Sequence, residues 1–301
     1  MPSNFKSMNP IRIFSTLLLT SLLWMGCERI IPFSAEDSTP LVVLYAALEP
    51  DMPIEAFVSK SVGILDNGEP ILLDDAQVWV EDSLHQVLDT LISMGLGMYR
   101  APNTLGQEGM RYTVHARSSV LAPVFGTAQV PMIPAEGAVD SINYAVGQMG
   151  GPGPGSSPFK EYSFQILDDG QPGYYQIEAY DRLRGQVTIP EYSLRIETDD
   201  PLVNGSGFGG NQYKDRLDIS NASFLGGSHT LTIRVFEWDF TGMEVLFKLK
   251  KVDEATFFYQ RSWDAYNKAN GNPFAQPVSV YSNVTDGLGV VSGMAYRWIL
   301  P

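Results

Sequence analysis

Three kinds of side chain in this sequence stand in patterns that could support chemistry: a single cysteine, pairs of neighbouring acids, and three histidines. Cys27 follows Gly26 at the end of an apolar run over residues 13–25. A small residue and then cysteine at this place is the lipobox pattern, in which the thiol receives a diacylglycerol and the freed amine an acyl chain such as palmitate. Two or more chains anchor a protein stably. We predict lipidation at Cys27.

The residues before Cys27 have the features of a signal peptide. Residues 1–12 carry Lys6 and Arg12 and no acid, and the apolar run behind them is too short to cross a hydrocarbon core of ~30 Å. We predict a signal peptide over residues 1–26 and a tether over residues 27–40. The alternative is an ordinary secretory signal with a chance cysteine.

The paired acids are candidate oxygen ligands for a cation. They lie at residues 74–75, 168–169 and 199–200, and Gly170 permits a tight wrap behind the second pair. Loop carboxylates can bind Ca²⁺, so Asp168 and Asp169 are weak calcium candidates. An Asp-Gly turn explains the same residues without a metal.

The remaining motifs predict no catalytic site, no cofactor and no other metal site. His85, His115 and His229 lie in separate segments without the spacing of a ready metal site. One cysteine excludes an intrachain disulfide and a cysteine-based zinc site. Residues 205–210 match G-x-G-x-x-G, but no strand precedes them and no helical stripe follows, so we interpret them as a loop.

The charge of the chain restricts its partners. It has 301 residues, with 34 acidic against 20 basic ones, and a formal net charge of −14. Loss of residues 1–26 would leave 18 basic residues and a charge of −16. This excess disfavours nucleic acid, whose phosphates need a basic surface, and an anionic membrane face.

The elements that must position these residues are predicted to be β-strands. Alternating apolar residues and turn clusters over residues 41–131 predict an N-terminal antiparallel sandwich. Within it, Ala76, Val78 and Val80 point to one face. Trp79 then points to the other face, and we predict it as an exposed ligand contact.

A second β domain is predicted over residues 132–301, with one helix. The helix spans about 254–269, is capped by Asp253, and stops at residues 270–273. Its aromatic face, which includes Tyr259 and Trp263, is expected to pack on the second sandwich.

The chain resembles a family of uncharacterised outer-membrane lipoproteins of Gram-negative bacteria. The resemblance is carried by Cys27, by the segments 75–80, 97–99 and 109–112, and by the C-terminal block 272–278 and 281–290. Members often sit beside TonB-dependent receptors, so the resemblance implies a place in the outer membrane and such a receptor as a partner. The first module also resembles transthyretin-type or immunoglobulin-like sandwiches.

Together these observations predict a lipid-anchored, non-enzymatic accessory or binding lipoprotein that assists a TonB-dependent transporter. Its ligand is open, and so is the choice between the periplasmic face and the cell surface, because Glu28 is followed by Arg29. One alternative is a structural or adhesive surface module. Another is a secreted hydrolase that uses an acid among residues 168, 169, 199 and 200.

Overall fold

Most of the chain behind residue 38 is described by a computed structural model. It covers residues 39–63, 69–148, 156–187, 193–203, 215–236, 241–270, 275–276 and 278–301, with only the backbone of residues 143–148 and 156–158. Residues Thr39–Pro301 form one unit by their internal contacts. None of the helices in these ranges has the length and apolar character needed to cross a membrane.

The protein is mainly β, as the alternating patterns predict. The first strands are β1 (Val42–Leu48), β2 (Pro53–Lys60), β3 (Ile71–Leu72), β4 (Gln77–Glu81), β5 (Val87–Gly95), β6 (Met98–Leu105), β7 (Arg111–Arg117) and β8 (Val124–Gln129). They are followed by β9 (Val139–Gln148), β10 (Ser156–Leu167), β11 (Tyr174–Leu183), β12 (Ser193–Glu197), β13 (Leu217–Ser220), β14 (Ser228–Phe236) and β15 (Met243–Val252). The last elements are helix α2 (Glu254–Ala269), β16 (Val284–Thr285) and β17 (Leu288–Ile299).

The first sandwich has two sheets around one hydrophobic core. One sheet joins β17, β1 and β2, and β3 and β6 pair with different parts of β2. The other runs β5, β4, β7, β8 and β16. Alternate residues of β1, β2, β4 and β7, such as Leu44 and Val58 or Val80 and Val114, are fully buried between the sheets, which is the pattern of a half-buried strand.

The second sandwich repeats this construction. One sheet runs β9, β10, β14 and β12, and the other contains β13, β11, β15 and β17. Rings fill much of its core, where Phe247 packs edge-on against Tyr162 and Phe164 with centroids 5.1 and 5.2 Å apart. Edge-to-face packing of this kind is the favoured geometry for buried rings.

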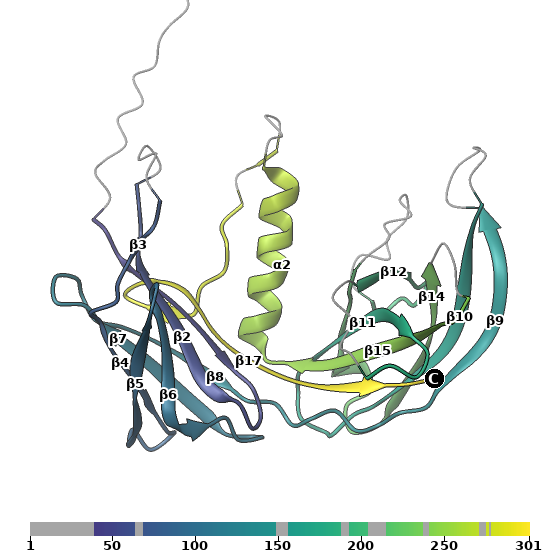
Figure 1. Cartoon of the computed structure of the whole chain (residues 1–301), viewed down its shortest axis with the longest axis horizontal. Coiled ribbons are helices and arrows are strands. Elements are labelled where there is room, and N and C mark those ends of the chain that lie inside the picture. Colours follow the sequence, from purple (N-terminus) through teal and green to yellow (C-terminus); the bar gives the residue numbers. More distant parts are fainter. Residues whose placement is uncertain are drawn as a thin grey trace, which may run out of the picture. The chain divides into compact units, whose positions relative to one another are not determined.

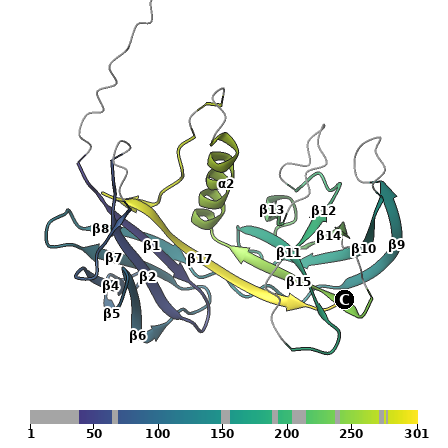
Figure 2. The same ribbon diagram turned by 45° about the horizontal axis from the view of Figure 1, so that its top comes forward.

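Strand β17 belongs to both sandwiches. We predict a boundary near residue 131, which would place every later strand in the second domain alone. Its first half pairs with β1 from Leu288 to Gly293, and its second half pairs with β15 from Met294 to Ile299. Figures 1 and 2 show β17 as one continuous strand between the two groups of strands. The pairing with β1 is parallel, whereas we expected an antiparallel sandwich.

Helix α2 begins and ends where the sequence predicts. The Asp253 side chain accepts a hydrogen bond from the Thr256 backbone N–H at 2.8 Å, which caps the helix. The expectation that its aromatic face packs on the second sandwich is wrong for Tyr259. Tyr259 contacts Tyr45 of β1 with centroids 6.0 Å apart, and it is Phe257 that stacks on Tyr174 of the second sandwich.

The close approach of β17 to β1 requires glycine at position 289. Gly289 has a φ of +111°, and a Cβ there would lie 2.1 Å from the carbonyl oxygen of Leu44. We expect Gly289→Ala to lower the free energy of unfolding by about 3 kcal/mol, because it combines a steric clash with an unfavourable φ. Chemical denaturation measures this loss.

Gly242→Ala is the matched control, because Gly242 has a φ of +73° and a Cβ there would meet nothing within 4 Å. Its loss should be about 1 kcal/mol, from conformation alone. Equal losses in the two variants would mean that the β1–β17 approach does not require a glycine.

Candidate functional site

Two of the sequence motifs fall where the structure gives no description. Cys27, with the predicted signal peptide and nearly all of the tether, and the glycine-rich segment 205–210 lie outside the described residues. Lipidation at Cys27 therefore stays a prediction.

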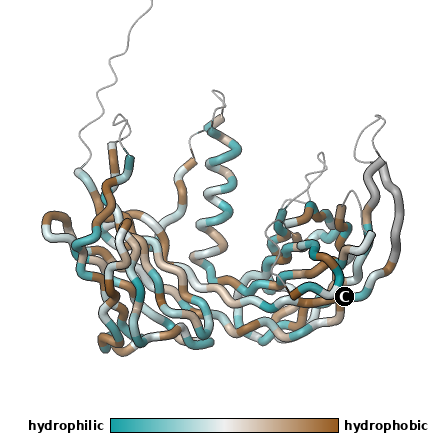
Figure 3. The backbone as a smooth tube through the Cα atoms, viewed as in Figure 1, coloured by the Kyte–Doolittle hydropathy of each residue, from teal (hydrophilic) through white to brown (hydrophobic). Residues whose placement is uncertain are grey.

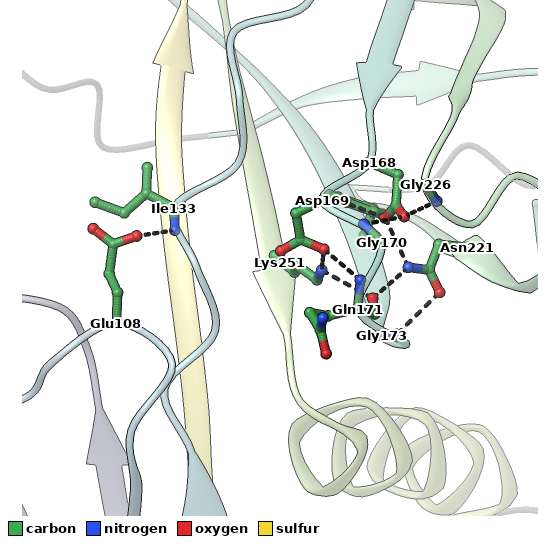
Figure 4. Close-up of polar contacts among 11 residues, drawn as sticks. Glu108, Ile133, Asp168, Asp169, Gly170, Gln171, Gly173, Asn221, Gly226 and Lys251 are labelled. Atoms are coloured by element: carbon green, nitrogen blue, oxygen red, sulfur yellow. Dashed lines mark hydrogen bonds and ion pairs between the residues drawn. The ribbon is translucent and has the colours of Figure 1, made fainter.

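Asp168 is a carboxylate whose two oxygens are both engaged by protein donors. Oδ1 accepts hydrogen bonds from the Asn221 amide at 2.7 Å and the Tyr175 hydroxyl at 2.9 Å. Oδ2 accepts from the backbone N–H groups of Gly170 and Gly226, at 2.9 and 2.6 Å. Burial would raise the pKa of Asp168, but these donors outweigh it and lower the pKa. Figure 4 shows the carboxylate enclosed by its donors.

Asp169 has a cation beside it that belongs to the protein. Its Oδ1 accepts from the backbone N–H of Gln171 at 2.9 Å and from the ammonium group of the buried Lys251. A calcium ion would have to displace these donors and lie next to a positive charge. Among the described residues no three His, Cys, Asp or Glu side chains form a group that could hold a metal. A turn that needs no metal accounts for this pair.

Asp199 and Asp200 are likewise paired. Asp199 forms an ion pair with Arg234. Asp200 places Oδ2 2.8 Å from Nε2 of His229, whose ring stacks on Phe224 with centroids 5.2 Å apart. In the described part of the chain no hydroxyl or thiol is hydrogen-bonded to His229, so the pair lacks the nucleophile that acyl transfer requires.

Trp79 lies on the outward face of its sheet but is only partly exposed. Its ring stacks on His115 of β7 with centroids 4.7 Å apart and planes at 4°, and His115 in turn lies 5.5 Å from Phe125 of β8. The indole N–H donates to Oε1 of Glu81 at 2.8 Å. One face of the ring and its only donor are therefore occupied, which limits what Trp79 can offer a ligand.

Glu81 brings together two of the histidines, which sequence spacing did not indicate. Its Oε2 lies 3.2 Å from Nε2 of His115 and 3.7 Å from Nδ1 of His85. The hydrogen bond from Trp79, together with these histidines, lowers the pKa of Glu81. The contact arises because Trp79 and His115 are register partners on adjacent strands, so that residues far apart in sequence share one face.

A layer of polar and aromatic side chains covers the outward face of β11, β15 and β17. Glu178 accepts hydrogen bonds from the Lys250 ammonium at 2.5 Å and the Tyr180 hydroxyl at 2.7 Å. Lys248 places its ammonium 3.9 Å from the centroid of the Tyr296 ring, in a cation–π contact. Burial and the nearby Lys250 lower the pKa of Lys248. This layer joins the second sandwich to α2.

The side of α2 toward that layer begins with the buried Phe257, which stacks on Tyr174, and continues with polar residues. The Gln176 amide, which is fully buried, donates to Oε1 of Gln260 at 2.5 Å and to Asp218 at 2.9 Å. Asp264, one turn further along the helix, lies 3.1 Å from the Arg216 guanidinium. Phe257, Gln260 and Asp264 thus form the side of the helix that contacts the second sandwich.

A neighbouring side of the helix, about 100° around its axis, carries the aromatic stripe, which consists of Tyr259, Trp263 and Tyr266. Successive rings are nearly parallel, with centroids 6.3 and 5.7 Å apart. Burial, together with a hydrogen bond to Tyr45, raises the pKa of Tyr259 to about 12. Trp263 and Tyr266 are 44% and 40% exposed. Exposed Trp and Tyr side chains combine a large apolar surface with a polar group, and they are enriched where proteins meet partners.

The comparisons with known proteins give no identity. No protein-family model matches the chain, and no curated protein matches it. A crystal structure of BcpA, the major pilin subunit of Bacillus cereus, is similar over 71% of this chain and 64% of its own, with 11% identity and a TM-score of 0.17. The match thus spans less than two thirds of the pilin. The yeast delta-COP-I mu-homology domain aligns over 87% of this chain and 97% of its own, with 9% identity and a TM-score of 0.17.

The donors around Asp168 generate a prediction about stability and pH. Asp168→Asn leaves several donors without a charged acceptor, so we expect a loss of about 3 kcal/mol in unfolding free energy at pH 7. Because the folded-state pKa is lowered, the stabilisation is present above the ordinary pKa and disappears as pH falls through the folded value.

The difference between wild type and Asp168→Asn should therefore shrink in acid, as measured by chemical denaturation at pH 7 and at progressively lower pH. The exposed Asp75 gives the control variant Asp75→Asn, which should lose little stability at any pH. A constant difference across the titration would contradict a charge-dependent role for Asp168.

Proposed function

We propose that this protein is a non-enzymatic accessory or binding lipoprotein, anchored by lipid in the outer membrane, that works with a TonB-dependent transporter. The observation that carries the proposal is the position of the chain's single cysteine, directly after Gly26 and an apolar run. The resemblance of the C-terminal block to outer-membrane lipoproteins supports the same location.

The anchor would act by concentrating the protein near its partner. Attachment to the membrane that holds the transporter makes the encounter effectively intramolecular, which raises the local concentration without any new contact. Weak contacts through a small surface are then sufficient for association.

The surface that we assign to this contact is the aromatic stripe on α2. Tryptophan and tyrosine contribute most of the energy in many protein interfaces, and Trp263 and Tyr266 are the two large rings of this helix that stay exposed. Capture through loops at the end of a sandwich remains compatible with this arrangement.

The alternatives are less well supported by the described residues. A hydrolase would need a free acid, yet Asp168 and Asp169 are engaged by protein donors, and Asp199 and Asp200 are paired with Arg234 and His229. A structural or adhesive module would be favoured by a deletion strain with normal uptake and altered cell aggregation.

Lipidation is tested by mass spectrometry of the native protein and of Cys27→Ser. We expect the wild-type protein to begin at an acylated Cys27 and to partition with membranes. The serine variant should keep its leader and lack the lipid mass. An unmodified Cys27 thiol in the mature wild-type protein would contradict the proposal.

The contact surface is tested by co-purification with the TonB-dependent receptor after mild solubilisation. We expect Trp263→Ala to lower the recovered receptor at least about tenfold, as for a residue worth 1.4 kcal/mol or more of binding energy. Phe125→Ala, which removes a ring of 39% exposure from the first sandwich, is the control and should recover wild-type amounts. Equal recovery by both variants would remove the aromatic stripe from the interface.

A further inference from the structure

The chain enters its fold at one end of the first sandwich, beside the last residues of β2. The backbone carbonyl of Leu41 accepts a hydrogen bond from the Ser61 N–H at 2.9 Å, and the Leu41 N–H donates to the Ser61 hydroxyl at 2.9 Å. The start of β8 lies at the same place, because a Cβ on Gly287 would meet both Val42 and Val124. The entry point therefore lies beside Ser61, directly after β2, and beside Val124 at the start of β8.

The β2–β3 and β7–β8 connections and their neighbours carry exposed apolar side chains. Val62 comes directly after Ser61, Ile71 is the register partner of Lys60, and Val120 lies in the connection that leads to Val124. Figure 3 shows hydrophobic colouring on β3, beside the place where the grey trace meets β1. The tether-end patch consists of Val62, Ile71, Val120 and Leu288, which are 39%, 52%, 79% and 44% exposed.

Single exposed apolar residues are common, but several of them close together on the surface indicate an interaction site. This group lies at the junction with the tether. From Cys27 to Thr39 there are twelve residue steps, which span at most roughly 40 Å when extended and about 20 Å as a flexible coil. A lipid on Cys27 therefore holds this end of the first sandwich within reach of the bilayer. This end is the part of the sandwich that the tether joins directly.

We propose that the tether-end patch contacts the bilayer in which the acyl chains of Cys27 are embedded. The inference rests on the proposed lipidation and adds a second, non-covalent contact to it. Apolar side chains that enter the interfacial region contribute binding energy in proportion to the area that they bury. The contact restricts rotation of the first sandwich about its tether.

The charges around the patch indicate which lipid surface it fits. Lys60 is the register partner of Ile71, and the exposed Glu69 and Asp286 each come two residues before Ile71 and Leu288. Because these acids and the negative charge of the whole chain would be repelled by anionic lipid, we expect the patch to bind a zwitterionic surface better than an anionic one.

The test uses the full-length lipidated protein in phosphatidylcholine vesicles. Cys27 is the only cysteine and its thiol is consumed by the lipid, so Ile71→Cys or Val120→Cys supplies one free thiol for an environment-sensitive fluorophore. Leu84→Cys is the matched control, because Leu84 is 72% exposed in the turn that joins the far ends of β4 and β5.

We expect the labels at positions 71 and 120 to shift their emission to shorter wavelength and to become at least about twofold less quenched by aqueous iodide than in detergent. The label at position 84 should keep its quenching. Circular dichroism and flotation of each labelled variant with the vesicles establish that the variants are folded and anchored.

Three results would overturn the proposal. Equal quenching at all three positions in protein that floats would leave the anchor intact and remove the patch from the bilayer. Protection that persists in detergent and rises with protein concentration would assign the patch to a second copy of the chain. Protein that does not float would refute lipidation itself, and the patch contact with it.

Discussion

The pairing of β17 with two different partners is the constraint on which the rest of the structure depends. Its first half is a parallel neighbour of β1 and its second half an antiparallel neighbour of β15, so a single backbone contributes to both hydrophobic cores. Gly289 allows the approach to β1, because a Cβ there would lie 2.1 Å from the carbonyl oxygen of Leu44, and Gly293 allows an equally close approach to Gln129 of β8. Any change that separates β17 from β1 therefore removes an edge from the first sandwich.

The charged residues of the second sandwich serve mainly to hold its connections together. Asp168 fastens the turn after β10 to the segment around Asn221, and Lys251 connects Asp169 and Gln171 to β15. A carboxylate with this many donors is stabilised in its charged form, and the donors are stabilised in turn. The exposed rings of α2, Trp263 and Tyr266, are different, since none of the described strands covers them.

Much of the fold was predictable because its strands alternate and its helix has clear ends. The residues of β4 and β7 show alternation directly, and Asp253 with Asn270 marks the limits of α2. Strand β17 was not predicted, because Gly289 and Gly293 interrupt its apolar run and resemble loop residues. Strand β5 was missed for a different reason: its apolar residues do not alternate with polar ones, and most of their side chains are exposed.

The candidate site was less predictable than the fold. Helical spacing identified Tyr259 and Trp263 as one face of the helix. Which strand packs against that face depends on the tertiary structure, and Tyr259 contacts Tyr45 of β1. The meeting of Glu81 with two histidines and of Lys248 with Tyr296 depends on strand register, which a single sequence does not specify.

The pairing of β1 with β17 also restricts the order in which the chain can fold. The Ser292 hydroxyl donates to the Ala46 carbonyl across 246 positions of the chain, at 3.0 Å. Strand β1 must therefore wait until β17, 246 positions later along the chain, has been made before its sheet closes. Until then, one edge of the nascent sheet stays open to wrong neighbours. Contacts this distant in sequence slow the search for the native pairing.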